Sequence, residues 1–303
     1  MEDEHFSTPS GDFLAVFDGH GGRAVSRYLR QNLYANVISS LPGVGNDGDG
    51  NSNSNSNNNN NNNFNVGNDE GGLIVPTNYP LHPSLDDHED ALKKALDKVD
   101  REVQRVSHWS FQGSTAVALW IYSDLTTRTV LTANIGDSRA VLSRSRKALS
   151  LTTDHKPNSP KEKARIEAQG GSVIWCGLVD KLGLPIETQG VYRVNGNLAL
   201  SRAMGDRSER PAVTAEPDIT RVQLVEQDEF IVLATDGLWD VMSSQEVVTY
   251  IHAVLDTHND PSKPDFRRKA LYENMANLLV AEALKRGTMD NVTIVILWLC
   301  PTR

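Results

Sequence analysis

The chain has few cysteines, no excess of positive charge and no long hydrophobic run. Its two cysteines, Cys176 and Cys300, form no recognisable motif, which favours a reducing, intracellular compartment. The formal net charge of −9 argues against nucleic acid as the main partner, because a phosphate backbone is normally met by a basic surface. Since no stretch of 18 apolar residues occurs and the first residues are acidic, the sequence predicts neither a membrane span nor a secretory signal.

With 303 residues, the chain is long enough for a substantial hydrophobic core, and we expect a single domain over residues 1–303. An Asn/Ser/Gly-rich tract at about 43–80 interrupts it and contains an unbroken run from Asn57 to Asn63. So polar a tract cannot bury enough apolar surface to offset the entropy lost on ordering. The sequence therefore predicts a disordered insertion there.

Outside this tract, hydrophobic periodicity predicts helices and strands in alternating groups. Asp86 or Asp87 would cap the second helix and Ser244 the fourth, whereas the glycines within 173–195 predict an irregular surface segment. Strands joined by short turns, with helices grouped between them, indicate an α+β fold with antiparallel sheets. The expected helices are 22–40, 86–106, 160–169, one from 244, and 266–286; the expected strands are 13–18, 115–122, 129–135, 139–143, 221–225, 230–235 and 292–299.

Three carboxylates lie at the ends of apolar runs. Asp18 follows Phe13–Phe17, Asp236 follows a run that starts at Phe230, and Asp290 comes just before a run that starts at Val292. A charge at the end of a buried strand must be paired or bound to a metal, because burying it alone is too costly. These motifs supply no matching Lys or Arg, so we expect a divalent cation, and all-oxygen ligands suit Mg²⁺ or Mn²⁺.

Seven motifs in order give the chain a specific resemblance. They are Asp18-Gly19-His20-Gly21-Gly22, Gly113-Ser114-Thr115-Ala116, Gly136-Asp137-Ser138-Arg139, Thr153-Asp154-His155-Lys156-Pro157, Leu200-Ser201-Arg202-Ala203-Met204-Gly205-Asp206, Asp236-Gly237-Leu238-Trp239-Asp240 and Gly287-Thr288-Met289-Asp290-Asn291. In this order and spacing they resemble the metal-dependent serine/threonine protein phosphatases of the PPM, or type 2C, family. The resemblance implies a sandwich of two antiparallel β-sheets flanked by α-helices, which agrees with the local patterns.

The resemblance also implies the ligands of two metal ions. Asp18 would bridge both ions, Asp236 and Asp290 would hold the first, and Glu2 and the carbonyl of Gly19 would help to hold the second through water. Asp3 would hydrogen-bond a metal-bound water. Two such ions lower the pKa of a shared water, and the resulting hydroxide attacks phosphorus directly, without a phospho-enzyme intermediate.

Two further residues of these motifs have alternative roles. His20 is a candidate general acid that protonates the leaving alkoxide, or it only hydrogen-bonds Asp18 and shapes the turn. Asp137 would bind a third, weaker metal together with Asp236, or it would pair with Arg139. Arg202 and Asp206 are expected to form an internal ion pair with a structural role.

One departure from the family concerns the start of the chain. Members normally carry a strand and a phosphate-gripping Arg ahead of the Met-Glu-Asp motif, which here begins at Met1. The sequence therefore predicts either a longer natural chain or a phosphate held only by metals and water. An Arg–phosphate contact is a strong charge-assisted bond, so its loss should raise KM.

We expect a serine/threonine phosphatase that acts as a monomer on phosphoproteins in the cytoplasm or nucleus, without nucleic-acid or membrane partners. A pseudophosphatase that serves as a binding or scaffolding module is the first alternative. The missing N-terminal segment favours it and the full set of core acids opposes it. A two-metal nuclease is the second, and the acidic balance of the chain opposes it.

Overall fold

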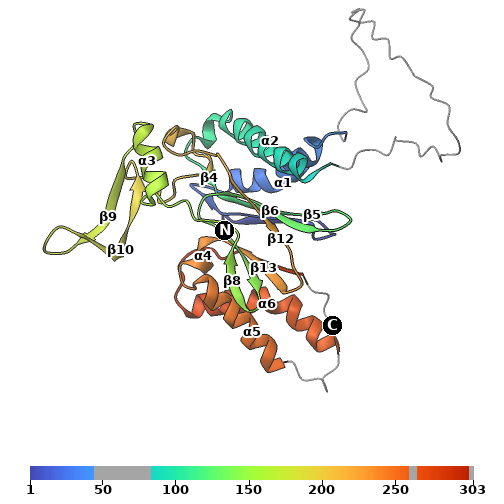
Figure 1. Ribbon diagram of the computed structural model, residues 1–303. Helices are drawn as coiled ribbons and strands as arrows, with labels where there is room; N and C mark the ends of the chain where they lie inside the picture. The colour runs from blue at the N-terminus through green and yellow to red at the C-terminus, as the bar shows by residue number, and fades with distance from the viewer. Residues whose placement is uncertain (44–82, 259–264, 300–303) are drawn as a thin grey trace, which may run out of the picture.

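The structure, a computed structural model, describes residues 1–43, 83–258 and 265–299 (Figure 1). From residue 44 on, the insertion predicted at about 43–80 lies outside the described residues. None of the helices in the described part is long and apolar enough to cross a membrane.

Two antiparallel sheets form the centre of the fold (Figure 1), which confirms the predicted α+β sandwich class. The order of the first sheet is β1 (Glu4–Ser7), β2 (Phe13–Phe17), β5 (Ala116–Ser123), β6 (Arg128–Ile135) and β12 (Asp218–Gln223). The order of the second is β14 (Ile294–Trp298), β13 (Asp228–Ala234), β7 (Arg139–Arg144) and β8 (Lys147–Ser150).

Strand β2 shows why the central strands are apolar throughout. Leu14 and Val16 pack between the two sheets, in one cluster with Leu233 of β13. Phe13 and Phe17 point to the opposite face and pack beneath the helices. All five residues of β2 are buried, because both faces of its sheet are covered, and a strand of this kind has no polar face.

Helices cover the outer face of each sheet (Figure 1). α1 (Ala24–Ser39) and α2 (Leu85–Gln104) lie on the first sheet, and α5 (Ser244–His258) and α6 (Asp265–Lys285) lie on the second. The predicted caps were wrong by a few residues. Ser84 caps α2 and Asp87 completes its capping box from the third position, while the hydroxyl of Ser243, not Ser244, bonds the backbone N–H of Glu246.

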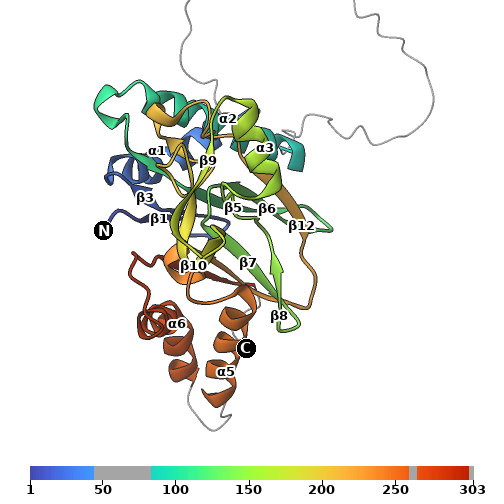
Figure 2. The ribbon, with the colours of Figure 1, turned by 90° about the vertical axis from the view of Figure 1, so that its left-hand side faces the viewer.

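The segment predicted to be irregular is a β-hairpin, so that prediction was wrong. β9 (Val173–Val179) and β10 (Pro185–Val194) pair in antiparallel register and project from the sandwich beside α3 (Pro160–Ala168), as Figure 1 shows; in Figure 2 the hairpin lies in front of the sheets. Gly177 lies opposite Gly190, where the two backbones approach too closely for a side chain. The glycines taken as strand breakers therefore permit the pairing instead.

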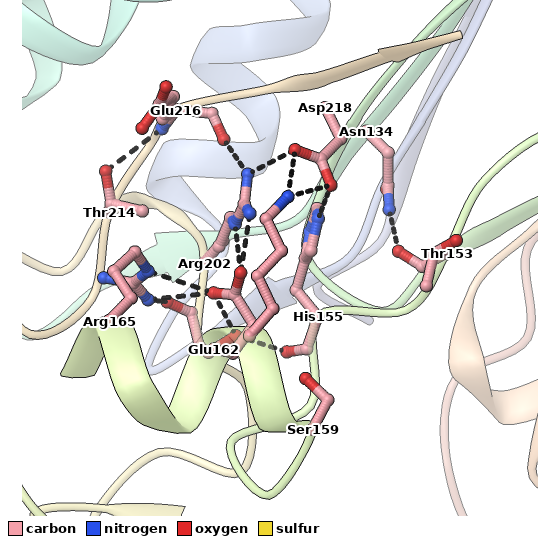
Figure 3. Close-up of polar contacts among 12 residues, drawn as sticks. Asn134, Thr153, His155, Ser159, Glu162, Arg165, Arg202, Thr214, Glu216 and Asp218 are labelled. Carbon is pink, nitrogen blue, oxygen red and sulfur yellow. Dashed lines mark hydrogen bonds and ion pairs between the residues drawn. The ribbon is translucent and has the colours of Figure 1, made fainter. Parts of the chain in front are cut away.

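Arg202 organises a buried network that joins α3 to β12 (Figure 3). Its guanidinium pairs with Glu162 at 2.6 Å and with Asp218 at 2.9 Å, so the predicted Arg202–Asp206 pair was wrong. Glu162 also accepts hydrogen bonds from Arg165 and Ser201. Burial alone would raise the pKa of Glu162, but Arg202 and these other donors lower it to about 2.

We expect Glu162→Gln to destabilise the protein by about 3–5 kcal/mol at pH 7, because it leaves the buried Arg202 charge without its main partner. The pKa of Glu162 is depressed from 4.5 to about 2, so its contribution is complete above about pH 5 and declines as pH falls through that interval. Urea unfolding of both proteins at several pH values measures the difference.

Glu167→Gln on the same helix is the matched control, since the exposed Glu167 lies 3.9 Å from Lys163. It should change stability by less than about 0.5 kcal/mol. A Glu162→Gln protein as stable as the parent at pH 7 would show that the network does not hold α3 in place.

Candidate metal centre

Asp18 lies where β2 gives way to a short strand, β3 (Gly19–His20). Its backbone is fixed by Thr115, whose hydroxyl accepts the Asp18 N–H at 3.1 Å and whose N–H donates to the Asp18 carbonyl at 2.9 Å. Burial raises the pKa of Asp18, and the nearby charges of Asp236, Asp3 and Asp137 raise it further, to about 10. The ends of the strands thus bring like charges together in a site that is partly buried from solvent.

Asp236 and Asp3 bring the second sheet and the start of the chain to the same place. Asp236 begins the short helix α4 (Asp236–Trp239) just after β13, and burial, followed by the charge of Asp137, raises its pKa to about 7. The hydroxyl of Thr235 donates to Asp3 Oδ2 at 3.0 Å. Burial raises the pKa of Asp3 more than its hydrogen bonds to Thr293 and Thr235 lower it.

Two oxygens of this cluster are buried without a hydrogen-bond partner among the described residues, Oδ1 of Asp3 and Oδ1 of Asp236. Buried polar atoms are normally bonded, so these two point to a ligand or water. A hard divalent cation fits, because it would stabilise the ionised form that burial and repulsion disfavour.

No group of three or more His, Cys, Asp or Glu side chains in the described part of the chain could hold a metal ion by itself. A complete side-chain set is not required for Mg²⁺, which keeps several waters and uses one or two carboxylates.

The other predicted ligands surround the cluster. Glu2 donates its N–H to Asn291 Oδ1 at 2.9 Å and accepts a hydrogen bond from Ser26 at its carbonyl. A side chain at Gly19 would come within 2.6 Å of the Glu2 carbonyl oxygen, so only glycine fits there. Asp290 is exposed in the loop before β14, which begins at Ile294 rather than 292, and its charge raises the pKa of Asp3 and Asp236.

Asp137 pairs with Lys156 rather than with Arg139, so that alternative was wrong. Lys156 Nζ lies 2.6 Å from Asp137 Oδ2, whereas Arg139 pairs with Asp154 at 2.7 Å. Burial alone would lower the pKa of Lys156, but Asp137 and then the more distant acids raise it. Sequence analysis gave Lys156 no role; its place two residues after Asp154 in a polar turn carries no signal of an internal cation.

Asp240 is the acid that sequence analysis passed over. Its side chain is exposed, but its pKa is raised. Partial burial contributes most to this rise and the charges of Asp137 and Asp290 add to it, whereas the charge of Lys156 opposes it. Its spacing of four residues from Asp236, one helical turn, was the available signal.

His20 has a partner that the sequence did not indicate. Its Nε2 is hydrogen-bonded to Asp206 Oδ2 at 2.6 Å, not to Asp18 as the alternative interpretation required. Burial alone would lower the pKa of His20, but the hydrogen bond and charge of Asp206 outweigh it and raise that pKa. Both residues lie at a small sheet of order β11 (Met204–Gly205), β4 (Gly113–Ser114) and β3. The carboxylate therefore holds the imidazole ring at β3, where the charges of Asp137 and Glu2 also act on it.

Comparison with known proteins identifies similar sequences. The sequence profile of the family described as "Protein phosphatase 2C" matches residues 1–292. "Probable protein phosphatase 2C 69" of Arabidopsis thaliana is 33% identical over 286 residues, which cover 93% of this chain and 60% of that protein. "Protein phosphatase 1B" of Bos taurus is 31% identical, over 98% of this chain and 53% of that protein. The chain thus spans about half to three fifths of the length of these two relatives.

Solved structures share the fold. A C. elegans sex-determining protein superposes with a TM-score of 0.72 at 26% identity, over 99% of this chain and 62% of that one. A phosphatase from a pathogenic strain of Toxoplasma gondii superposes with a TM-score of 0.66 at 23% identity, over 98% of this chain and 88% of that one. At that identity the second likeness concerns the fold alone.

We expect Asp236→Asn to raise the melting temperature of the protein in EDTA, because it removes one of several mutually repelling charges without changing the side chain's shape. Each kcal/mol gained raises Tm by about 2–4 °C in domains of 150–250 residues. Differential scanning fluorimetry with and without Mn²⁺ measures both states. The parent should gain stability from Mn²⁺ and the variant should gain much less. A variant that melts lower in EDTA but responds fully to Mn²⁺ contradicts both parts.

Proposed function

The chain belongs to the protein phosphatase 2C family, and on that premise we propose that it is a metal-dependent phosphatase acting on phosphoserine and phosphothreonine in proteins. The observation that carries the proposal is the cluster of Asp3, Asp18 and Asp236, in which burial and repulsion raise every carboxyl pKa and two oxygens have no described partner. Bound cations would stabilise the ionised form of such a cluster. The cluster also adjoins His20, whose imidazole ring is held by the Asp206 carboxylate.

Two Mg²⁺ or Mn²⁺ ions would be held by the residues that the family motifs select. Asp18 would contact both, Asp236 and Asp290 one, and Glu2 with the Gly19 carbonyl the other. When bound, the ions supply an activated water as nucleophile and neutralise charge on the phosphoryl group. A third, weaker ion at Asp137 and Asp236 would have to compete with the Lys156 ammonium, 2.6 Å from Asp137.

Around this centre the side chains of the protein have separate tasks. Asp3 is held by the hydroxyl of Thr235, and its Oδ1, which has no hydrogen-bond partner among the described residues, would accept a hydrogen bond from a water in the site. His20 uses Nε2 to bond Asp206, so Nδ1 is the nitrogen that would carry the proton given to the departing seryl or threonyl oxygen. Because Asp206 is an anion, it favours the protonated ring that this step needs.

We expect Asp236→Asn and Asp290→Asn each to lower kcat more than about 100-fold at saturating Mn²⁺, because each removes a charged ligand of the proposed ions. Turnover of p-nitrophenyl phosphate and of a phosphothreonine peptide measures the loss. If the unmutated protein hydrolyses both substrates, the pseudophosphatase alternative is also excluded. Asp256→Asn is the matched control, since Asp256 is exposed and forms an ion pair with the exposed Arg146. Neither residue is a proposed metal ligand. Parental activity in the Asp236 and Asp290 variants would overturn the ligand assignment.

We expect His20→Ala to slow the phosphothreonine peptide by about 10²–10⁴-fold and p-nitrophenyl phosphate far less, because an alkoxide needs a proton on departure and a nitrophenolate does not. The ratio of kcat values for the two substrates is the measurement. The Mn²⁺ concentration for half-maximal activity should stay unchanged, since His20 is not a proposed ligand. Equal losses on both substrates would assign His20 a bracing role only.

A further inference from the structure

The turn that carries Asp206 has an unusual backbone. Gly205 has φ of 80°, and Asp206 has φ of 45° and ψ of 49°, so two successive residues lie in the left-handed region. A residue other than glycine adopts this conformation uncommonly, and it persists only where its surroundings fix it. Something outside the turn must therefore hold it.

An ion pair holds both sides of Gly205. Asp100 Oδ1 accepts the Gly205 N–H at 2.8 Å, and Arg210 Nε donates to the Gly205 carbonyl at 3.1 Å. Arg210 also donates from Nη2 to the Ala203 carbonyl at 3.0 Å and to Asp100 Oδ1 at 2.9 Å. The peptide groups on either side of Gly205 are thus fixed by one connected set of bonds.

This ion pair is itself anchored in the core. Asp100 lies on α2 between Val99 and Val103, both of which are buried against the first sheet. Asp100 is 7% exposed, and its carboxylate also accepts a hydrogen bond from Gln104. Since α2 is a long helix whose apolar face is buried, it holds Asp100 in a fixed position relative to the turn.

Gly113 shows how little freedom the His20–Asp206 contact has. A Cβ at Gly113 would overlap the Asp206 carboxylate and come within 2.5 Å of His20 Nε2. The hydrogen bond between the two side chains therefore passes directly over the Gly113 backbone. A small displacement of the Gly205–Asp206 turn would move the carboxylate against this backbone or away from the imidazole ring.

We propose that the Asp100–Arg210 ion pair is the positioning element of the site: it fixes the left-handed Gly205–Asp206 turn and, through Asp206, the orientation of the His20 imidazole. Neither Asp100 nor Arg210 touches the reacting atoms, and both act through the backbone of the turn. The inference rests on the proposed general-acid role of His20.

The test replaces Arg210 by Ala and, separately, by Lys. Lys keeps the charge beside Asp100, so this variant should fold, but it lacks the planar fork that reaches two carbonyls and a carboxylate at once. We expect both variants to lower kcat for a phosphothreonine peptide by about 10–100-fold, because misplacing a reacting group by about 1 Å costs up to that much. Turnover of p-nitrophenyl phosphate should fall by less than about threefold, because its leaving group needs no proton.

Arg101→Gln is the matched control, since Arg101 follows Asp100 directly on α2 but forms an exposed ion pair with Asp97 of the same helix. It should leave both substrates at parental rates. A merely structural role for Arg210 would lower turnover of both substrates by the same factor, in step with the loss of folded protein seen by circular dichroism. Equal losses of this kind, or parental turnover of the peptide in the Lys variant, would overturn the proposal.

A double-mutant cycle separates this inference from the proposed function. If Arg210 acts through His20, adding Arg210→Lys to His20→Ala should change peptide turnover by less than about threefold. A full additional loss in the double variant would overturn the positioning role while leaving the general acid intact. If His20→Ala itself does not discriminate between the substrates, the general-acid role fails first.

Discussion

Repulsion among carboxylates at the junction of the two sheets is the constraint on which the site depends. Asp18 comes from the first sheet, Asp236 from the second and Asp3 from the start of the chain. Asp236 and Asp3 raise the cost of ionising Asp18, while Asp137 raises that of Asp236 and Asp290 that of Asp3. A fold keeps such a cluster only if the apolar packing on both sides is strong enough to resist it. Three hydrophobic clusters supply that packing, one between the sheets and one beneath each helical layer.

Asp18 and Asp3 are held by hydrogen bonds with Thr residues rather than by countercharges. Thr115 fixes Asp18 through both of its main-chain groups, and Thr235 bonds the Asp3 side chain and the N–H of Thr293. Hydroxyls fix position without neutralising charge, so the negative potential remains available to a ligand. This is the electrostatic arrangement expected of a site whose negative charge binds a ligand and is not neutralised by neighbouring side chains.

Sequence patterns predicted much of this. The apolar runs that end in Asp18 and Asp236 predicted the strands and the acids that follow them, because a buried strand is a continuous apolar run and a charged residue at its end is easily recognised. The β9–β10 hairpin was missed because Gly177 and Gly190 resemble breakers until their pairing is known. The partners of Arg202, Asp137 and His20 were missed or mistaken because each lies 16 to 186 residues away along the chain.

The direction of each pKa shift separates two uses of a carboxylate in this chain. Burial acts on Glu162 as it does on Asp18, yet the pKa of Glu162 falls to about 2 while that of Asp18 rises to about 10. Arg165 and Arg202 pair with Glu162, and Arg202 also pairs with Asp218, so those acids stabilise the native state by being ionised. The acids beside Asp18 have mainly one another: Lys156 pairs with Asp137, and its charge only partly offsets the raised pKa values of Asp236 and Asp240. An acid cluster that destabilises the ionised fold is retained where binding a cation recovers the lost free energy. This distinguishes the candidate metal centre from the Arg202 network, although both are built on carboxylates.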